Sequence, residues 1–568
     1  MEEEAKKEIQ KIALQNAFEH EGKTQDKIVL AKILGTKAEF RTRVKEISEE
    51  IKTIVSEINQ LSFEEQKKII EENFPDILIP KEKTEEREGL PPLKNAEHGK
   101  VVTRFPPEPN GYPHIGHAKA AIINAEYAKM YDGKFILRMD DTNPEAERME
   151  YHAAIKVGLD WLGIKFDVIK NTSDDMEIFY EKGIELINSG KAYVCTCKRE
   201  DISENRRERI ACKCSKGDIK QSNKGWEKMF GKFKSGDAIV RFRGDMKADN
   251  AVMRDPVLFR IIEEKHYTLG NKYRVWPSYD FAVAIEDSID GVTHAFRSKE
   301  FELRKELIDA ILDALNMRKP YQDFFSRLEF KGMPISKRIL KPLIEEGKVS
   351  WYDDPRLPTL ESLRRRGIKP EAIKKFILSL GLTKANTLAP FDALESFNRK
   401  FVDADSIRLF MVSKPKKLTI KKLPFSFVEI SNHPIKDMGK RKINIDENFY
   451  ISGEDVENMK GTKIRLLGLG NIVISNNNGE LVGEFIEGES NSEIQKIQWI
   501  PQKDAHMIKI LIPKQLFIDE KFNEDSLEEL EVYTEPHYLE LKDGEEIQFV
   551  RFGYCRKDSQ NQAIFTHK

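Results

Sequence analysis

The chain lacks several features that would each fix its class at once. Its 568 residues show no excess of one charge, because 94 Lys+Arg face 96 Asp+Glu and leave a net charge of −2. This balance excludes a wholly basic nucleic-acid binder, so any polyanionic partner must be met by local basic patches. The sequence also has no apolar run of about 20 residues that could cross a membrane. Residues 1–10 (MEEEAKKEIQ) do not read as a secretory signal, so we expect a cytoplasmic protein without a membrane partner.

Cysteine is scarce as well, with five residues in the whole chain. Four of them form two close pairs, Cys195-Thr-Cys197 and Cys212-Lys-Cys214. In a reducing compartment such a cluster indicates a metal site more than a disulfide framework, and four thiolates suit tetrahedral Zn²⁺. Because the pairs are C-x-C rather than C-x-x-C, four free thiols are the alternative. Cys555 stands alone in a β-like segment and reads as a small core residue.

The length predicts about four domains, or three with one large catalytic unit. Residues 1 to about 88 read as helices, with apolar residues at helical spacing between residues 40 and 59. Residues 81–98 are charged and then carry Pro91 and Pro92, which is typical of a linker. We therefore expect a helical N-terminal extension over residues 1–98.

The pattern then changes to strand, loop, helix and strand between residues 99 and 139. This is a βαβ unit, whose natural place is a parallel sheet. Ligands bind at the carboxyl ends of such strands, so the loop at 106–116 is the first place to look for chemistry. After about residue 410, short alternating runs broken by turn clusters predict antiparallel β-barrels.

This loop ends in two histidines, His114 and His117, that flank Gly116 at the predicted start of a helix. Imidazole donors and free backbone N–H groups would there face the same place, which suits the phosphates of a nucleotide. Gly116 would let the ligand approach the backbone closely. Taken alone, a His pair at a helix start is more often a capping or packing feature.

The surrounding strings are far more specific. TRFPPEPNGYPHIGHAKAAIIN (103–124) followed by LRMDDTNP (137–144) resembles the signature of the class I aminoacyl-tRNA synthetases of the glutamyl and glutaminyl branch. The resemblance continues in order through residues 276–301, 333–340 and 351–368, and so covers about residues 99–410. With the helical N-terminus and the β-rich C-terminus, the chain is most similar to the archaeal-type glutamyl enzymes of that branch.

The resemblance implies an α/β fold with a Rossmann-like parallel-sheet catalytic domain. Its two halves would be residues 99–190 and 271–330, separated by an insertion at 191–270 that contacts the tRNA acceptor end and carries the cysteines. A signature loop and helical connector would follow at 331–412. Residues 413–568 would form the β-barrels that bind the anticodon. Basic runs at 364–369 and 414–422 would contact tRNA phosphates, although such runs are usually solvated faces.

The implied reaction is an attack of the glutamate carboxylate on the α-phosphorus of ATP, which enters with Mg²⁺. The resulting glutamyl-adenylate passes its acyl group to tRNA(Glu). No protein nucleophile is needed, and the resemblance assigns His114, His117 and Lys337 as catalytic donors to the phosphates. Further ATP contacts are expected from Pro107, Gly111, Gly116, Ser336 and Arg338.

The second signature departs from the family pattern. Pro334-Ile335 stands where Lys-Met usually precedes Ser-Lys, so only Ser336-Lys337 is present. Arg338 or Lys331 would have to supply the missing charge. An ordinary solvated loop is the alternative for this segment.

Arg297 occupies the position that resembles the carboxylate-reading arginine of glutamyl enzymes. A guanidinium matches a carboxylate with two parallel hydrogen bonds, whereas an amide would leave it partly unpaired at a cost of about 1–3 kcal/mol. We therefore expect L-glutamate rather than glutamine as substrate. The rest of the expected glutamate pocket consists of Arg104, Glu108, Asp140 and Tyr279.

Several alternatives stay open at this point. Asp141 or Thr142, beside the expected amino-group ligand Asp140, could simply cap a helix. A glutaminyl enzyme and a catalytically inactive tRNA-binding relative are the competing functions, but the second would be expected to lose His114, His117 or Lys337. Charging of tRNA(Gln) with glutamate is not decided by the sequence. A monomer is expected.

Overall fold

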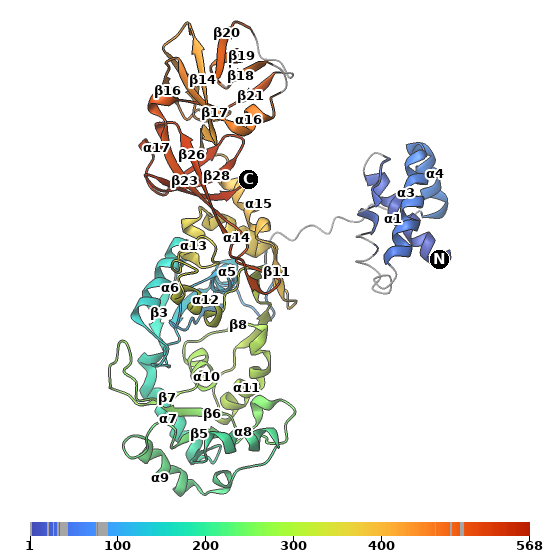
Figure 1. The fold of residues 1–568 in the computed structure, drawn as a ribbon. Helices are drawn as coiled ribbons and strands as arrows, with labels where there is room; N and C mark the ends of the chain where they lie inside the picture. Colours follow the sequence, from blue (N-terminus) through green and yellow to red (C-terminus); the bar gives the residue numbers. More distant parts are fainter. Residues whose placement is uncertain are drawn as a thin grey trace. The chain divides into compact units, whose positions relative to one another are not determined.

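The computed structural model describes residues 3–19, 22–26, 28–30, 33, 44–74, 77, 89–459, 462–477, 480–488 and 494–568. The chain divides into two compact units, Met1–Glu88 and Gly89–Lys568 (Figure 1). Residues 81–88 of the expected linker lie outside the described residues, and Pro91 and Pro92 belong to the second unit. No described helix has the length and apolar character needed to span a membrane.

The described part of the first unit is helical, which confirms the predicted helical character of the N-terminal region. Its longer helices are α1 (Glu3–Glu19), α3 (Val44–Gln60) and α4 (Phe63–Asn73). Ile47, Ile51 and Ile58 on α3 are buried because their spacing places them on one face of the helix. Ser62 begins α4 with a capping box, in which its side chain and that of Glu65 each accept a backbone N–H.

The second unit begins with the predicted parallel sheet. β1 (Val102–Phe105), β2 (Lys134–Met139) and β3 (Val168–Asn171) pair in parallel, as do β8 (His294–Ser298) and β9 (Tyr321–Phe325). The N–H of Thr293, just before β8, donates to the carbonyl of Val102 in β1 at 2.9 Å, which brings the two groups of strands together. The strand order thus reverses at β1, and this is where ligands bind in sheets of this kind.

Helices connect and cover these strands. α5 (Ile115–Met130) joins β1 to β2, which confirms the βαβ unit, and α10 (Tyr279–Ile289) leads into β8. Both helices are buried along much of their length, α5 in the core that contains β1 and β2 and α10 in a second core shared with the antiparallel strands described below. The other helices of the catalytic part and the connector are α6 (Met149–Trp161), α7 (Met176–Asn188), α11 (Lys305–Ala314), α12 (Lys337–Glu345), α13 (Leu360–Arg365), α14 (Pro370–Ser379) and α15 (Phe391–Val402). A short parallel pair, β10 (Leu328–Phe330) with β11 (Thr387–Ala389), lies between them.

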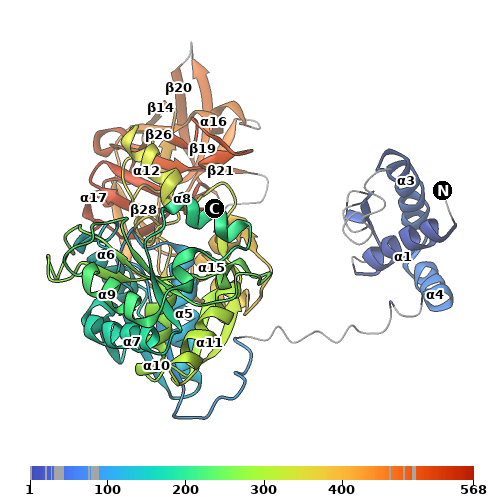
Figure 2. The ribbon, with the colours of Figure 1, turned by 90° about the horizontal axis from the view of Figure 1, so that it is seen from below.

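An antiparallel sheet interrupts the parallel one. It contains β4 (Ala192–Cys195), β5 (Ile239–Phe242), β6 (Val257–Ile261) and β7 (Val275–Pro277), so it extends past residue 270 to Pro277. α8 (Arg199–Arg207) and α9 (Ile219–Met229) lie in the segment between β4 and β5. α9 packs beside α7 of the catalytic part (Figures 1 and 2). In the core beneath this sheet, the rings of Trp226 and Phe259 pack together with 5.1 Å between their centroids.

The C-terminal part contains two seven-stranded sheets. The first consists of β12 (Ile407–Leu409), β13 (Met411–Ser413), β23 (His506–Pro513), β26 (Leu527–Thr534), β27 (Glu546–Phe549), β28 (Gly553–Ser559) and β29 (Gln562–His567). The second consists of β14 (Pro415–Lys421), β17 (Asn448–Ser452), β18 (Lys463–Leu466), β19 (Gly470–Asn477), β20 (Glu480–Ile486), β21 (Gln495–Ile497) and β22 (Trp499–Pro501). Shorter elements are β15 (Phe427–Ser431), β16 (Lys440–Asn444), α16 (Gly453–Glu457), β24 (Phe517–Ile518), β25 (Lys521–Phe522) and α17 (His537–Glu540).

These sheets confirm the predicted β-rich region, but they are not purely antiparallel. Four pairs are parallel: β12 with β27, β14 with β20, β18 with β21, and β23 with β29. Alternating hydrophobicity identifies strands but not their partners, and here strands far apart in the sequence pair with each other. The chain enters the first sheet, builds the whole second sheet, and then returns to complete the first.

Gly133, just before β2, lies directly against the backbone of Val101. An added Cβ there would lie 2.2 Å from the carbonyl oxygen of Val101, which is backbone and cannot turn away. We expect Gly133→Ala to lower the free energy of unfolding by about 1–3 kcal/mol. Gly231→Ala is the control, because an added Cβ at Gly231 has no neighbour within 4 Å. Equal unfolding midpoints for the two variants in a denaturant titration would contradict this expectation.

Candidate active site

A cavity of about 520 Å³ opens at the carboxyl end of β1, between the two halves of the catalytic domain. The sequence-predicted residues that line it are Pro107, Glu108, His114, Gly116, His117, Asp140, Tyr279 and Arg297. Five other predicted residues are not part of this wall: Arg104, Gly111, Ser336, Lys337 and Arg338. The cavity thus combines most of the expected phosphate-facing and glutamate-facing groups in one place.

The histidine pair is held by its own backbone. Nδ1 of His114 accepts the N–H of Gly116 at 3.1 Å, and Nδ1 of His117 accepts the N–H of His114 at 3.2 Å. Because Nδ1 is the acceptor in each neutral ring, the ring proton lies on Nε2. Burial lowers the pKa of His117 to about 4 and that of His114 well below its ordinary value. The pair therefore both caps α5 and offers two neutral N–H donors at the cavity.

Gly116 is required by the ring beside it. An added Cβ would lie 2.9 Å from Cε1 of His114, so any larger residue would push that ring from its position. The added Cβ would also lie 3.7 Å from Cδ1 of Ile335 in the signature loop. Gly116 thus lets the loop and the histidine ring approach the helix start together.

The signature loop presents only Ile335 to the cavity. Ser336 is the N-cap of α12, and Lys337 is the first residue of that helix. The ammonium of Lys337 donates to the carbonyl of Asn110 and lies 5.0 Å from the ring centroid of Tyr151. Lys337 must therefore leave these partners before it can reach a phosphate in the cavity.

Two acidic neighbours have different surroundings. Asp140 is 7% exposed and faces the cavity, and burial raises the pKa of its carboxyl to about 6. An ammonium group brought there by a ligand would favour its charged form. Asp141 instead accepts the N–H and the hydroxyl of Ser173, both at 2.8 Å, so it has a structural role, but through a distant segment and not as the cap of the helix that follows it.

The aromatic wall of the cavity is formed at the start of α10. Tyr279 packs against Phe301 with 5.2 Å between the ring centroids, and the guanidinium of Arg304 lies 5.8 Å from the ring of Tyr279. All three residues line the cavity. The Tyr279 ring is therefore fixed from two sides.

The two arginines expected to meet substrate are placed differently. Arg297 lines the cavity; its Nη1 donates to Oε1 of Gln322 at 2.5 Å and its Nη2 to Oδ2 of Asp287 at 2.6 Å. Its Nε has no hydrogen-bond partner among the described residues. Arg104 is fully buried, and its three nitrogens donate to Asp287 and to the carbonyl of Phe296. In this structure Arg104 lies behind the wall and not in it.

Other residues of the wall were not predicted from the sequence. They include Lys119, Arg304 and Arg327. Lys119 lies in the Ala- and Ile-rich helix α5, where its ammonium donates to the carbonyl and hydroxyl of Ser326 at 2.7 and 2.9 Å. Burial lowers its pKa to about 8. A lysine on an otherwise apolar helix face was the one available hint.

Within the basic run at 364–369, Arg364 is exposed, whereas Arg365 and Arg366 have acidic partners in the protein; phosphate contacts of this run stay a prediction. Arg365 pairs with Asp558, Arg366 with Glu395, and both bonds are 2.7 Å long. These pairs fasten the connector to its neighbours. The sequence showed only the positive charges, since their acidic partners come from distant segments. Residues 414–417 and 421–422 are exposed, as a phosphate-binding surface requires.

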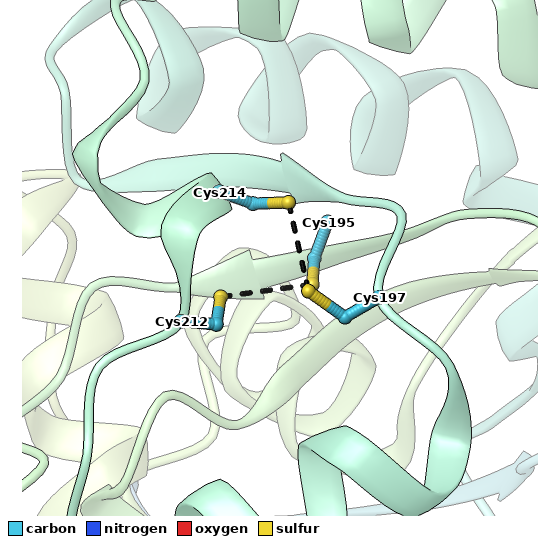
Figure 3. A group of neighbouring side chains, drawn as sticks. All are labelled: Cys195, Cys197, Cys212 and Cys214. Carbon is cyan, nitrogen blue, oxygen red and sulfur yellow. Dashed lines mark hydrogen bonds between the residues drawn. The ribbon is translucent and has the colours of Figure 1, made fainter.

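The four clustered cysteines come together beside β4. Sγ of Cys195 lies 3.9 Å from that of Cys212, Sγ of Cys197 lies 3.7 Å from that of Cys214, and all four fall within 4.8 Å of one another (Figure 3). A tetrahedral zinc with Zn–S bonds of about 2.3 Å needs sulfur atoms about 3.8 Å apart. The buried Arg241 also donates to Sγ of Cys212 at 3.6 Å, which favours a thiolate there. The cluster therefore fits a metal ion.

A second cavity of about 690 Å³ adjoins this cluster. Cys195 and Cys197 form part of its wall, and the remainder includes five arginines: Arg199, Arg206, Arg207, Arg254 and Arg260. So many guanidinium groups around one hollow favour a polyanionic ligand.

The fold and the cavity define a nucleotide-binding α/β enzyme, with neutral N–H donors at a helix start on the switch point of a parallel sheet. Residues 100–404 match the family described as tRNA synthetases class I (E and Q), catalytic domain, and residues 406–489 and 496–558 match its two anticodon binding domains. The chain belongs to this family of class I tRNA synthetases.

Similar proteins span its full length. A glutamate–tRNA ligase of Nitrosopumilus maritimus is 79% identical over 569 residues, with 100% of each chain covered. One of Cenarchaeum symbiosum is 58% identical over 99% of each chain, and one of Pyrococcus furiosus is 40% identical over 99% of this chain and 100% of its own. Among solved structures, a glutamate tRNA ligase from Elizabethkingia meningosepticum matches with a TM-score of 0.41 and 19% identity, covering 54% of this chain and 70% of that one.

The neutral state of His117 makes a specific prediction about its replacement. If Nε2–H acts as a neutral donor to phosphate, His117→Ala should lower glutamate-dependent pyrophosphate exchange by about a hundredfold or more. His117→Gln, which supplies a neutral N–H at a similar reach, should keep the rate within about tenfold of the original. If the glutamine variant is no better than the alanine variant, a neutral donor is not what the site requires.

The cysteine cluster is expected to bind one metal ion per chain. Replacing Cys197 by Ser should remove the bound metal, because the tetrahedral set then lacks one thiolate. Cys555→Ser is the matched control, since Cys555 is buried far from the cluster in the first C-terminal sheet. Elemental analysis of the purified chain should find zinc in the wild type and the control. Four freely reactive thiols in the folded wild type would count against a metal role.

Proposed function

We propose that this chain joins L-glutamate to tRNA(Glu) through a glutamyl-adenylate, consuming ATP and releasing diphosphate and AMP. The observation that carries the proposal is the Arg297 guanidinium, which faces the same cavity as the neutral histidine pair. A carboxylate reader and phosphate donors are thereby combined in one hollow. The family membership and the full-length relatives named as glutamate–tRNA ligases support this reading.

In the first step, a carboxylate oxygen of glutamate bonds to the α-phosphorus of ATP, and the bond to the bridging oxygen of the leaving diphosphate breaks. Mg²⁺ arriving with ATP would neutralise part of the phosphate charge. The Nε2–H groups of His114 and His117 would stabilise the charge that develops on the phosphate oxygens. Lys337 would join them after leaving the Asn110 carbonyl, with Ser336 and Arg338 carried along at the start of α12.

The amino acid would lie across the other half of the cavity. Asp140 would accept hydrogen bonds from the α-ammonium group, the Tyr279 ring would close one side, and Arg297 would pair with the side-chain carboxylate. Pro107 and Glu108 belong to the same wall, whereas Gly111 lies outside it. Arg104 would act indirectly, because its donors are used inside the protein.

The acyl group then passes to the terminal ribose of the tRNA. We place the acceptor end near the arginine-lined cavity of the insertion, where a structural Zn²⁺ held by the four cysteines would fix the loops that form the wall. The two C-terminal sheets, which match anticodon binding domains, would read the anticodon. A cytoplasmic monomer acting on tRNA(Glu) is the simplest assembly that meets these requirements.

Exchange of pyrophosphate into ATP with glutamate and with glutamine tests the substrate. Wild type should prefer glutamate, and a preference for glutamine would instead indicate a glutaminyl enzyme. Absence of exchange with either amino acid would indicate a tRNA-binding relative without activity. Aminoacylation of purified tRNA(Glu) and tRNA(Gln) then decides whether both are charged.

Arg297 should set this preference. Arg297→Leu leaves the substrate carboxylate unpaired in a buried site, so kcat/KM for glutamate should fall by about a hundredfold or more while glutamine is little affected. Arg297→Lys should recover only part, because an ammonium cannot form two parallel bonds. Equal losses for both amino acids would mean that Arg297 serves the fold and not the choice of substrate.

A further inference from the structure

Asp287 on α10 is a buried carboxylate on which three arginines converge. Its oxygens accept hydrogen bonds from Arg104 (2.9 and 3.1 Å), from Arg138 (2.9 Å) and from Arg297 (2.6 Å). The three donors belong to β1, β2 and β8. One side chain therefore connects the strands on both sides of the point where the sheet order reverses.

These four hydrogen bonds use all the lone-pair sites that a carboxylate offers. Burial alone would raise the pKa of Asp287, but the positive charges of Arg104, Arg138 and Arg297 hold it well below its ordinary value. Asp287 is thus a fully engaged anion with no capacity left for a ligand.

The three arginines differ in their other partners. Arg138 also pairs with Asp290 at 2.7 Å and lies 3.9 Å from Glu286. Arg104 and Arg297 have no other carboxylate partner among the described residues. Both therefore depend on Asp287 alone for an anionic partner, and Arg297 is the member of the group that faces the cavity.

We propose that Asp287 is a positioning residue that sets the preference for glutamate by holding the Arg297 guanidinium in a fixed orientation. Asp287 at Nη2 and Gln322 at Nη1 fix two points of a planar group, so its plane is determined before the substrate arrives. The long arginine side chain then loses its conformational entropy when the protein folds and not when the substrate binds. The inference rests on the proposed function, because it assigns Arg297 to the substrate carboxylate.

Asp290 provides a matched comparison within the same cluster. It follows α10 directly, is largely buried, and pairs with Arg138 at 2.7 Å and with Lys170 at 3.0 Å. It contacts neither Arg104 nor Arg297 in the described part of the chain. Loss of its charge should disturb the cluster to a similar degree without releasing Arg297.

The test compares Asp287→Asn with Asp290→Asn in glutamate- and glutamine-dependent pyrophosphate exchange. In Asp287→Asn an amide nitrogen faces a guanidinium, so Arg297 loses an anchor; KM for glutamate should rise about tenfold or more, and the preference over glutamine should fall. KM for ATP should stay within about twofold, as should KM for glutamate in Asp290→Asn. Equal changes in both variants, or an unchanged preference in Asp287→Asn, would overturn the proposal.

Gln322→Leu keeps the proposal testable if Asp287→Asn does not fold. This change removes the second anchor of Arg297 without removing a charge, so KM for glutamate and the preference should shift in the same direction by about threefold to tenfold. No shift would overturn the proposal. A wild-type chain that does not use glutamate would refute the proposed function itself, an outcome distinct from any difference between the variants.

Discussion

The candidate active cavity lies where β1 and β8 are joined, through hydrogen bonds between Val102 and Thr293. The residues on its two sides are separated by the whole antiparallel sheet and its helices, yet the cavity exists only where β1 and β8 meet. A backbone hydrogen bond joins the edges, and the shared carboxylate of Asp287 joins the side chains beneath them. As long as β1 and β8 stay joined, the insertion can carry its own sheet and cysteine cluster without disturbing the site.

Neutrality of the histidine pair follows from the same close packing. The rings are buried, their Nδ1 atoms accept backbone N–H groups, and protonation would take both arrangements apart. Neutral donors attract a bound polyphosphate less than cations do, and they gain most where charge develops during the reaction. In the proposed reaction the positive charge would come from Lys337, whose ammonium here contacts the carbonyl of Asn110 and the ring of Tyr151.

Local features of the sequence predicted most of the fold and part of the cavity. The histidines and Gly116 are neighbours in the sequence, and the four cysteines lie in one short stretch, so local spacing was enough to predict that the members of each group lie close together. The different places of Arg104 and Arg297 depend on Asp287, which is far from Arg104 in the sequence, and on Gln322, which lies outside the quoted motifs; the sequence does not show which of these residues pair. The internal pairs of Arg365 and Arg366 and the parallel strand pairs were missed for the same reason: they are set by long-range partners.

The nested order of the two C-terminal sheets has a consequence for how this part of the chain can change. Met411 and His506 lie just before and just after the segment that forms the second sheet. Both pair with the same residue, Thr534, from its two sides. The chain thus enters and leaves the second sheet at two adjacent points of the first, as in an inserted domain whose ends are neighbours. The second sheet could therefore be replaced or altered as one unit during evolution. Replacing only the C-terminal segment would instead remove strands that pair within the first sheet.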